Sequence, residues 1–377
     1  MQCLYGGPGC KHLRGMFAAP VLRLKLPRQI LHVLSTDRRT TLKLTVALAT
    51  SVATLGLLGG ASVARSSAPA GSSPAVLAKK RCKVVVKRVR GKRRRVRVCR
   101  RVTPRRAPIL VGAGDIAAAP PGTTGGDEAT AKLLDATVAA NPARVTVFTA
   151  GDNAYDSGAS AQFSSYYQPT WGRQKAITWP SPGNHDYLTP RASGYFAYFG
   201  AAAGDSARGY YVYTRGAWRI YSLNSEIAHG AGSAQERWLR TDLAAHASVT
   251  CVLAYWHRPR FSSGTPPSDA SLRALWQALY DYGGDVVVSG HNHSYQRFAP
   301  QSATGKLDVM NGVREYVVGT GGNGHHTFTA PISNTEAYNT NTYGVFKLTL
   351  HPASYDFEFL PQAGKTYNDK ATGLRCH

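Results

Sequence analysis

The chain has 377 residues and a formal net charge of +24, a basicity typical of nucleic-acid-binding proteins. The charge is confined to one end: residues 1–106 hold 25 of the 45 basic residues and one acidic residue, whereas residues 107–377 hold 20 of each. Composition therefore excludes a general nucleic-acid-binding role for the neutral part, which is long enough for one large domain with a substantial core. We expect no specific nucleic-acid partner.

Residues 38–64 have the pattern of an export signal. Two arginines precede an apolar run at 44–58, and small residues follow it. The run is too short and too rich in Ala and Thr for a membrane-spanning helix. A twin-arginine signal and a general secretory signal remain alternatives. We expect a secreted or cell-envelope-associated protein, with residues 1–37 as a non-native or untranslated extension.

Residues 65–106 comprise a Ser/Pro-rich linker and a basic Val/Lys/Arg segment. Valines alternate with charges on both sides of Arg90 and Gly91, which favours a hairpin with a two-residue loop. In that register Cys82 lies opposite Cys99, and a disulfide between them suits an oxidising compartment. The alternative is a disordered basic tether. In either case we expect residues 79–106 to contact an anionic cell envelope.

Residues 107–377 are predicted to form a single catalytic domain. The sequence pattern predicts strands at 109–113, 144–150, 249–256, 285–289 and 315–318, helices at 128–140, 233–246 and 270–282, an antiparallel pair at 210–214 and 218–223, and a final hairpin of 343–350 and 354–360. Alternating strands and helices with antiparallel pairs predict an α/β fold with mixed sheets. For Cys251 and Cys376, a disulfide and a buried Cys251 with a free Cys376 remain alternatives.

Five short motifs follow strand-like runs or, at 179–182, a turn-rich approach. They are Gly114-Asp115, Gly151-Asp152-Asn153-Ala154-Tyr155, Gly183-Asn184-His185-Asp186, Trp256-His257 and Gly290-His291-Asn292-His293. Ligand sites in open α/β sheets collect at the carboxyl ends of strands, so we expect these motifs to meet. Each alone has an ordinary alternative, such as an Asp that caps a turn. Together their oxygen and imidazole ligands suit hard or borderline metal ions and predict a two-metal site.

Individual residues of these motifs indicate finer chemistry. A phenol that titrates near pH 10 binds as phenolate only to a strongly acidic cation, so Tyr155 favours ferric iron. His185 is expected to donate a proton near neutral pH. His291 and His293 alternate, and alternate residues at a strand end can point to the same side. A structural zinc site is disfavoured because no cysteine pair accompanies these histidines.

In this order the five motifs resemble those of the calcineurin-like metallophosphoesterases, and the Gly-Asp-x-x-Tyr spacing resembles the purple acid phosphatase branch. The similarity extends from about residue 109 to residue 323 and includes the segments 290–297 and 319–323. The resemblance implies a four-layer αββα sandwich with two mixed β-sheets. It also implies two metal ions, one held by Asp115, Asp152, Tyr155 and His293 and the other by Asp152, Asn184, His257 and His291.

The sequence departs from the family pattern in two places. Ala117 stands where the family usually has glycine, and the stretch after His257 lacks the additional histidines of many relatives. Arg258 and Arg260 lie in that stretch and are candidates to clamp a phosphate, with solvated surface arginines as the alternative. Metal binding is still expected despite these departures, but they leave the identity of the substrate open.

The expected function is that of a secreted, dinuclear metal-dependent phosphoesterase. A metal-activated hydroxide would attack a phosphate monoester, with His185 and Asp152 as catalytic residues. The expected cofactors are Fe(III) beside Tyr155 and Fe(II), Zn(II) or Mn(II) at the second position. The first alternative is a phosphodiesterase or nucleotidase using the same site. The second is a basic surface-binding protein for which the metal domain serves as a scaffold.

Overall fold

The structure is a computed structural model and describes residues 80–101, 106–119 and 125–377. The expected export signal at 38–64 and the extension at 1–37 lie outside these residues, as does most of the predicted linker. Among the residues described, no helix has the length and apolarity needed to cross a bilayer.

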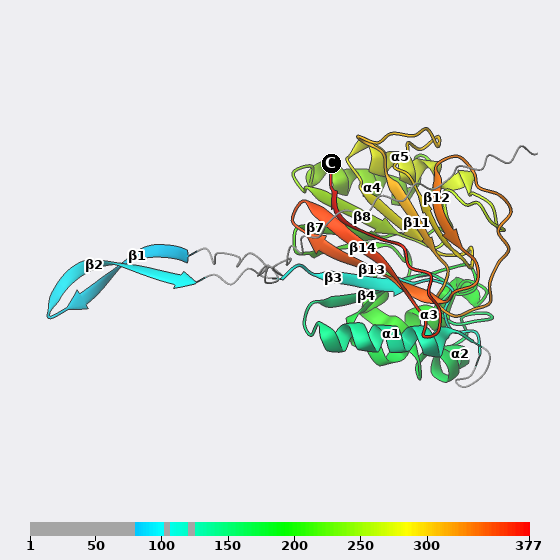
Figure 1. The fold of residues 1–377 in the computed structure, drawn as a ribbon, viewed down its shortest axis with the longest axis horizontal. Coiled ribbons are helices and arrows are strands. Elements are labelled where there is room, and N and C mark those ends of the chain that lie inside the picture. Colours follow the sequence, from blue (N-terminus) through cyan, green and yellow to red (C-terminus); the bar gives the residue numbers. More distant parts are fainter. Residues whose placement is uncertain (1–79, 102–105, 120–124) are drawn as a thin grey trace, which may run out of the picture. The chain divides into compact units, whose positions relative to one another are not determined.

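The basic segment forms the hairpin that its alternation predicted. β1 (Lys80–Val89) and β2 (Lys92–Arg101) pair in antiparallel fashion as a separate two-stranded sheet (Figure 1). Cys82 lies opposite Cys99, and the two form a disulfide. The structure therefore has the hairpin and not the disordered tether.

A six-stranded mixed sheet contains the first predicted strands of the neutral part. Its order is β15-β14-β13-β3-β4-β5. The strands are β3 (Ile109–Ala113), β4 (Val145–Ala150), β5 (Thr178–Ser181), β13 (Gly344–His351), β14 (Ser354–Pro361) and β15 (Lys370–Arg375). β3, β4 and β5 run parallel to one another, whereas β13 runs antiparallel to both β3 and β14. Every residue of β3 is buried, as expected for a strand covered on both faces.

A second, seven-stranded mixed sheet has the order β12-β10-β11-β9-β8-β7-β6. Its strands are β6 (Tyr211–Arg215), β7 (Trp218–Ser222), β8 (Cys251–Tyr255), β9 (Val286–Ser289), β10 (Tyr295–Phe298), β11 (Arg314–Val318) and β12 (Thr335–Asn339). β6 and β7 are the predicted antiparallel pair, and β7, β8, β9 and β11 run parallel in that order.

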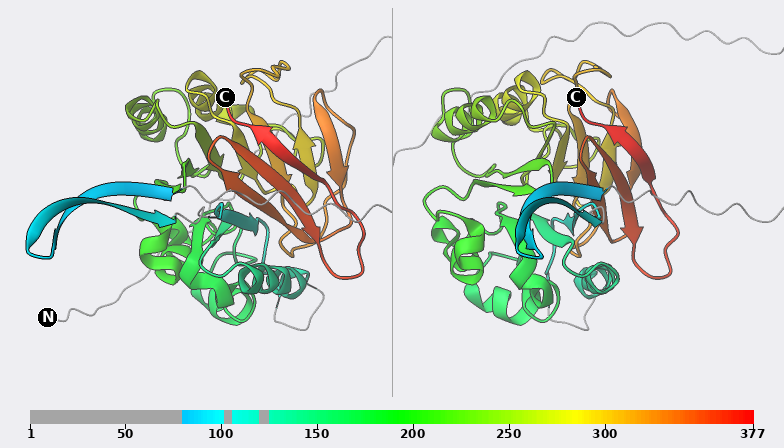
Figure 2. Two further views of the ribbon diagram at one scale, coloured as in Figure 1. Left: turned by 60° about the vertical axis from the view of Figure 1, so that its left-hand side comes forward. Right: turned by 90° about the vertical axis from the view of Figure 1, so that its left-hand side faces the viewer.

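Helices cover the outer faces of the two sheets. They are α1 (Asp127–Ala140), α2 (Ser160–Gln162), α3 (Ser193–Phe199), α4 (Ala234–Ala245) and α5 (Arg273–Asp281). Figures 1 and 2 show α4 and α5 outside the seven-stranded sheet and α1 to α3 on the side of the six-stranded sheet. Leu239 of α4 and Leu275 of α5 pack in one core cluster with Val252 of β8. The four-layer αββα sandwich with two mixed sheets is confirmed.

Local details differ from the sequence predictions. The turn-rich approach at 179–182 is largely strand β5, which tolerates Pro180 because it lies at the edge of its sheet. The predicted helix at 233–246 begins one residue later, because Ser233 is its N-cap: the Ser233 hydroxyl accepts from the Glu236 amide, and the Glu236 carboxylate accepts from the Gly232 amide. Of the two alternatives for Cys251, the structure has the disulfide with Cys376.

Candidate metal centre

The five motifs meet at one edge of the two sheets. Asp115 follows β3, Asp152 follows β4 and Asn184 follows β5, so three ligand candidates come from the six-stranded sheet. His257 follows β8, and the Gly290–His293 motif connects β9 to β10 in the other sheet. The carboxyl ends of parallel strands therefore bring the predicted residues together, as expected for an α/β fold.

The first group of side chains surrounds the Tyr155 hydroxyl. This oxygen lies 2.9 Å from Asp115 Oδ1, 2.9 Å from Asp152 Oδ2 and 3.2 Å from His293 Nε2. His293 Nε2 also lies 3.1 Å from Asp115 Oδ1. Two carboxylates, a phenol and an imidazole thus converge within hydrogen-bond distance, and all four side chains are buried or nearly so.

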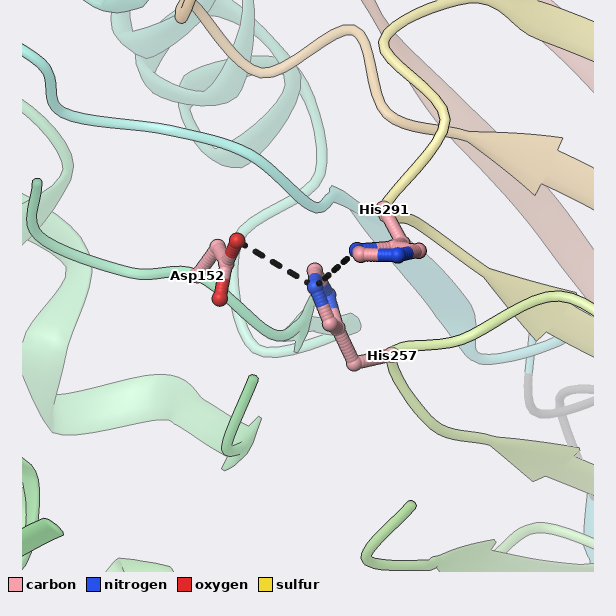
Figure 3. Close-up of side chains that lie close together, drawn as sticks. All are labelled: Asp152, His257 and His291. Carbon is pink, nitrogen blue, oxygen red and sulfur yellow. Dashed lines mark hydrogen bonds and ion pairs between the residues drawn. The ribbon is translucent and has the colours of Figure 1, made fainter. Parts of the chain in front are cut away.

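The second group surrounds His257 Nε2. This nitrogen lies 2.9 Å from Asn184 Oδ1. It also lies 3.1 Å from His291 Nδ1 and 3.2 Å from Asp152 Oδ2, the two contacts drawn in Figure 3. The other ring nitrogen, Nδ1, is 2.9 Å from the Ala150 carbonyl, which can only accept, so Nδ1 carries a proton. That hydrogen bond aims Nε2 into the cluster, as in many histidine metal ligands.

Asp152 connects the two groups. Its Oδ2 atom is the oxygen that faces both the Tyr155 hydroxyl and His257 Nε2, while its Oδ1 atom accepts from the His185 amide at 2.8 Å. The family resemblance assigned these two groups of side chains to two metal ions. In the structure the two groups share the Asp152 carboxylate. Ligand-capable atoms of Asp152, His257 and His291 all lie within 4.8 Å of one another, which fits a bound cation.

The backbone at these positions is unusual. Asp115, Asp152 and His291 all have positive φ, between 51° and 64°, in the left-handed region that is uncommon for residues other than glycine. Such conformations persist where the surrounding structure enforces them, and they cluster at functional sites. His291 and His293 consequently reach the cluster from a turn rather than from alternate positions of a strand, and they join different groups.

Glycines allow the motif loops to approach closely. A Cβ atom on Gly183 would lie 2.2 Å from Asp152 Oδ1, and one on Gly290 would lie 2.6 Å from Asp115 Oδ2. Ala117, which replaces the family glycine, is fully buried and bridges to Ala154, so it does not separate the loops after β3 and β4.

Charge pairing sets the protonation of the metal-free cluster. Burial would lower the pKa of His257, but the nearby Asp152 carboxylate outweighs it and raises the pKa to about 10. The same pairing holds the pKa of Asp152 below its usual range despite burial. Burial, together with Asp115 and Asp152, raises the pKa of the Tyr155 phenol well above 10. A cation that binds these groups must therefore displace protons from His257 and Tyr155.

His185 lies at the rim of the cluster. Its Nε2 atom is 4.0 Å from Asp152 Oδ2, and its side chain is 33% exposed. The other ring nitrogen contacts the carbonyl of Asp156, and the ring lies against Tyr155 with centroids 4.4 Å apart. One nitrogen therefore faces the cluster while the ring remains open to solvent, which suits a proton donor to a bound ligand.

The two predicted arginines occupy different places. Arg258 Nη1 lies 3.2 Å from His291 Nε2, and its Nε donates to both Glu226 carboxylate oxygens at 3.0 Å. Arg260 is not brought to the cluster: its guanidinium donates to the Ala303 carbonyl and lies over the Phe261 ring. These contacts give no support to the expectation that Arg260 binds phosphate, whereas Arg258 lies beside a predicted metal ligand.

Two supporting residues had no role in the sequence predictions. The buried carboxylate of Asp186 accepts from the backbone and side-chain amides of Asn153 and from the Gly183 amide, which fixes two motif loops to each other. His326 stacks on His293 with ring centroids 3.7 Å apart, and its Nδ1 accepts from the His293 amide. Asp186 lies within a recognised motif, but the sequence around His326 carries no comparable signal.

Comparison with known proteins identifies the fold and the family. Residues 110–295, which contain all five motifs, match the sequence model of the calcineurin-like phosphoesterases. Residues 110–295, just under half of the chain, belong to this family. In structure, the chain resembles a purple acid phosphatase from yellow lupin (Lupinus luteus) seeds, with a TM-score of 0.58 at 18% identity over 70% of this chain and 53% of the lupin chain.

Among curated proteins, the chain is similar to purple acid phosphatases. Purple acid phosphatase 15 of Arabidopsis thaliana is 33% identical over 178 residues, which cover 42% of this chain and 33% of that protein. An acid phosphatase of Aspergillus ficuum is 28% identical over 41% of this chain and 29% of its own length. The chain thus spans about a third of the length of these relatives.

Proposed function

We propose that this protein is a dinuclear metal-dependent phosphoesterase that hydrolyses phosphate monoesters. The observation that carries the proposal is the position of Asp152, whose Oδ2 atom faces both the Tyr155 group and the His257 group. Family membership supports the same chemistry, since the similar proteins are named acid phosphatases. Residues 107–377 would form the catalytic domain.

The donor chemistry of the two groups supports two different cations. Asp115, Asp152, Tyr155 and His293 would hold Fe(III), because a phenolate with two carboxylates suits a strongly acidic cation. Asp152, Asn184, His257 and His291 would hold Fe(II), Zn(II) or Mn(II), which accept imidazole and neutral oxygen ligands. When bound, such a pair lowers the pKa of water and neutralises phosphoryl charge.

Two side chains at the rim would act on the ester itself. His185 would protonate the leaving alkoxide, because its Nε2 faces Asp152 while its ring stays accessible to solvent. Arg258 would bind phosphate oxygens next to His291. Its guanidinium is held by the nearly buried Glu226 carboxylate, and the Arg258 side chain remains 31% exposed, so it is both fixed and reachable.

The N-terminal part supports a proposal about location. The signal pattern at 38–64 would export the protein, by a twin-arginine or a general secretory route, to the cell envelope or the medium. The basic residues 79–106 would hold it near an anionic envelope. Disulfides at Cys82–Cys99 and Cys251–Cys376 agree with an oxidising compartment.

A pair of chromogenic esters tests the proposed activity. We expect p-nitrophenyl phosphate to be hydrolysed faster than bis-p-nitrophenyl phosphate, with loss of activity after chelation and recovery on adding metal. A chain that begins at Ala107 should keep this activity. Faster hydrolysis of the diester would indicate the phosphodiesterase alternative, and full activity after verified removal of all metal would contradict the proposal. Loss of all function in the shortened chain would favour the surface-binding alternative.

A further inference from the structure

The hairpin has a restricted composition. Between Cys82 and Cys99 the chain uses only Lys, Val, Arg and Gly, and nine of the residues are basic while none is acidic. Six of the nine are arginines. None of the residues predicted for the metal centre lies in this segment. Its two strands pair regularly from the disulfide to the turn.

The register divides these side chains between two faces. Directly opposite residues share a face, and residues alternate between faces along each strand. One face, here the arginine face, carries Val84, Val86, Arg88, Arg93, Arg95 and Arg97. The other, here the lysine face, carries Lys83, Val85, Lys87, Lys92, Arg94, Val96 and Val98. Valines of the arginine face are 61–63% exposed, whereas those of the lysine face are half-buried.

Like charges lie opposite each other across the hairpin. Arg88 pairs with Arg93 on the arginine face, and Lys87 pairs with Arg94 on the lysine face. Such pairs destabilise a two-stranded sheet, which is marginal in isolation in any case. The Cys82–Cys99 disulfide closes the ends of the two strands and so opposes this repulsion. A bound polyanion would relieve the repulsion, which makes the hairpin complementary to dense negative charge.

We propose that the arginine face is a docking surface for a linear phosphate polymer that carries no nucleobases. Arg93, Arg95 and Arg97 occupy alternate positions of β2, so their Cα atoms form a row with a spacing of about 6.8 Å. The planar guanidinium fork binds phosphate oxygens in pairs, and the row can engage several phosphates spaced along an extended chain. This binding does not depend on the chemistry of the metal centre.

Composition argues against two other polyanions. Proteins that hold single-stranded nucleic acid stack bases on aromatic side chains, and those that read duplex DNA use Asn or Gln as well as Arg. The segment from 82 to 99 contains none of the aromatic or amide residues. Peripheral membrane attachment generally adds Trp, Phe or Leu to basic residues, and these are also absent from this segment. The hairpin therefore offers a polyanion mainly positive charge, which fits a polymer whose only binding groups are phosphates.

Two matched triple variants of the full chain test the role of the face. R93Q/R95Q/R97Q removes three charges from the arginine face, and K83Q/K87Q/K92Q removes three from the lysine face. With long-chain inorganic polyphosphate as the probe, the arginine variant should bind at least about tenfold more weakly than the lysine variant. The salt dependence of its log affinity should also fall by about two. Equal losses in both variants would overturn the proposal.

Further experiments test the choice of polyanion and the need for the strand register separately. Tighter binding to DNA or to anionic phosphatidylglycerol vesicles than to polyphosphate, compared per charge, would overturn the choice of polymer. C82S/C99S should weaken polyphosphate binding, because the arginine row depends on the strand register; unchanged binding would contradict a structured docking surface. All variants should hydrolyse p-nitrophenyl phosphate as the parent does, so failure of the docking proposal and failure of the phosphoesterase proposal are distinguishable.

Discussion

At the scale of single residues, metal binding at His257 competes with a proton. Because the Asp152 carboxylate raises the pKa of His257 to about 10, the imidazole is protonated at neutral pH in the metal-free protein. We expect metal affinity to rise with pH below that value, by up to about tenfold per pH unit for each proton displaced. Calorimetry in two buffers of different ionisation enthalpy counts the protons. Metal uptake without proton release near neutral pH would contradict the assignment.

The same pair makes the stability of the metal-free protein depend on pH. A raised pKa in the folded state means that the folded protein binds the proton more tightly than the unfolded one. The stabilising contribution of His257 is therefore fully present below its ordinary pKa of 6.5 and is lost as the pH rises toward about 10. Bound metal replaces this proton, so the metal-loaded protein should show a weaker decline.

Replacing His185 tests proton donation to the leaving group. In His185→Ala we expect a loss of about 10²-fold or more on an alkyl phosphate, which needs a proton on its leaving oxygen. The loss on p-nitrophenyl phosphate should be much smaller, because p-nitrophenolate leaves without one. Metal content should stay unchanged, since His185 is not among the proposed ligands. Equal losses on both esters would assign His185 a structural or binding role instead.

Tyr155 tests the identity of the first metal. A phenolate on ferric iron absorbs visible light, so the purified protein should be coloured and Tyr155→Phe should lose that band. Elemental analysis of both proteins is the matched control. A colourless, fully active protein that contains no iron would rule out the ferric assignment and leave the phosphoesterase proposal in place.

The proposed metal ligands were easier to predict from the sequence than the residues that position them. Asp115, Asp152 and His257 follow apolar runs that are strands, so their meeting could be expected because ligand sites collect at the carboxyl ends of strands. His326 contacts His293 only because a distant loop returns to the cluster. Arg260 is two residues from Arg258, but the chain turns its side chain toward Ala303, and no local pattern indicates that turn.

At the scale of elements, the loops after the parallel strands must pack closely for the ligands to meet. Gly183 follows β5, and a Cβ atom there would lie 2.2 Å from Asp152 Oδ1 and 2.4 Å from the Asp152 amide nitrogen. Gly183→Ala should therefore displace Asp152, reduce metal content and cost about 1–3 kcal/mol of stability. Metal analysis and thermal unfolding measure the two effects.

Gly230 is the matched control for that substitution. It lies in the loop before α4 and has no positive φ, and a Cβ atom added there would have no neighbour within 4 Å among the described residues. Gly230→Ala should leave metal content and activity unchanged. If Gly183→Ala behaves in the same way, close packing of the loops is not what holds Asp152 in place.

Elements with a clear period were predictable, and short ones were not. α1, α4 and α5 lie within two or three residues of their predicted bounds. β5 was missed because Pro180 normally excludes a strand, and an edge position is a property of the sheet that no local pattern shows. β10 was missed because its residues Tyr295–Phe298 directly follow the histidine motif and are only four residues long.

At the scale of the whole molecule, long-range pairing was beyond the sequence pattern. β13 pairs with β3, which joins the last third of the chain to the start of the neutral part, and Cys376 reaches Cys251 in β8. The four layers and two mixed sheets were predicted from the family resemblance. Local periodicity alone does not give the order of strands in the sheets. The hairpin register was predictable because it depends only on a local turn and alternation.

Metal content per chain, measured by elemental analysis on purified protein and on Asp152→Asn, tests the central claim most directly. The shared carboxylate predicts two metal ions in the parent chain. The variant should lose at least one of them, and hydrolysis should fall by at least about 100-fold. A fully active parent with at most one metal ion, or an Asp152→Asn protein that keeps two ions and full activity, would contradict the two-metal centre.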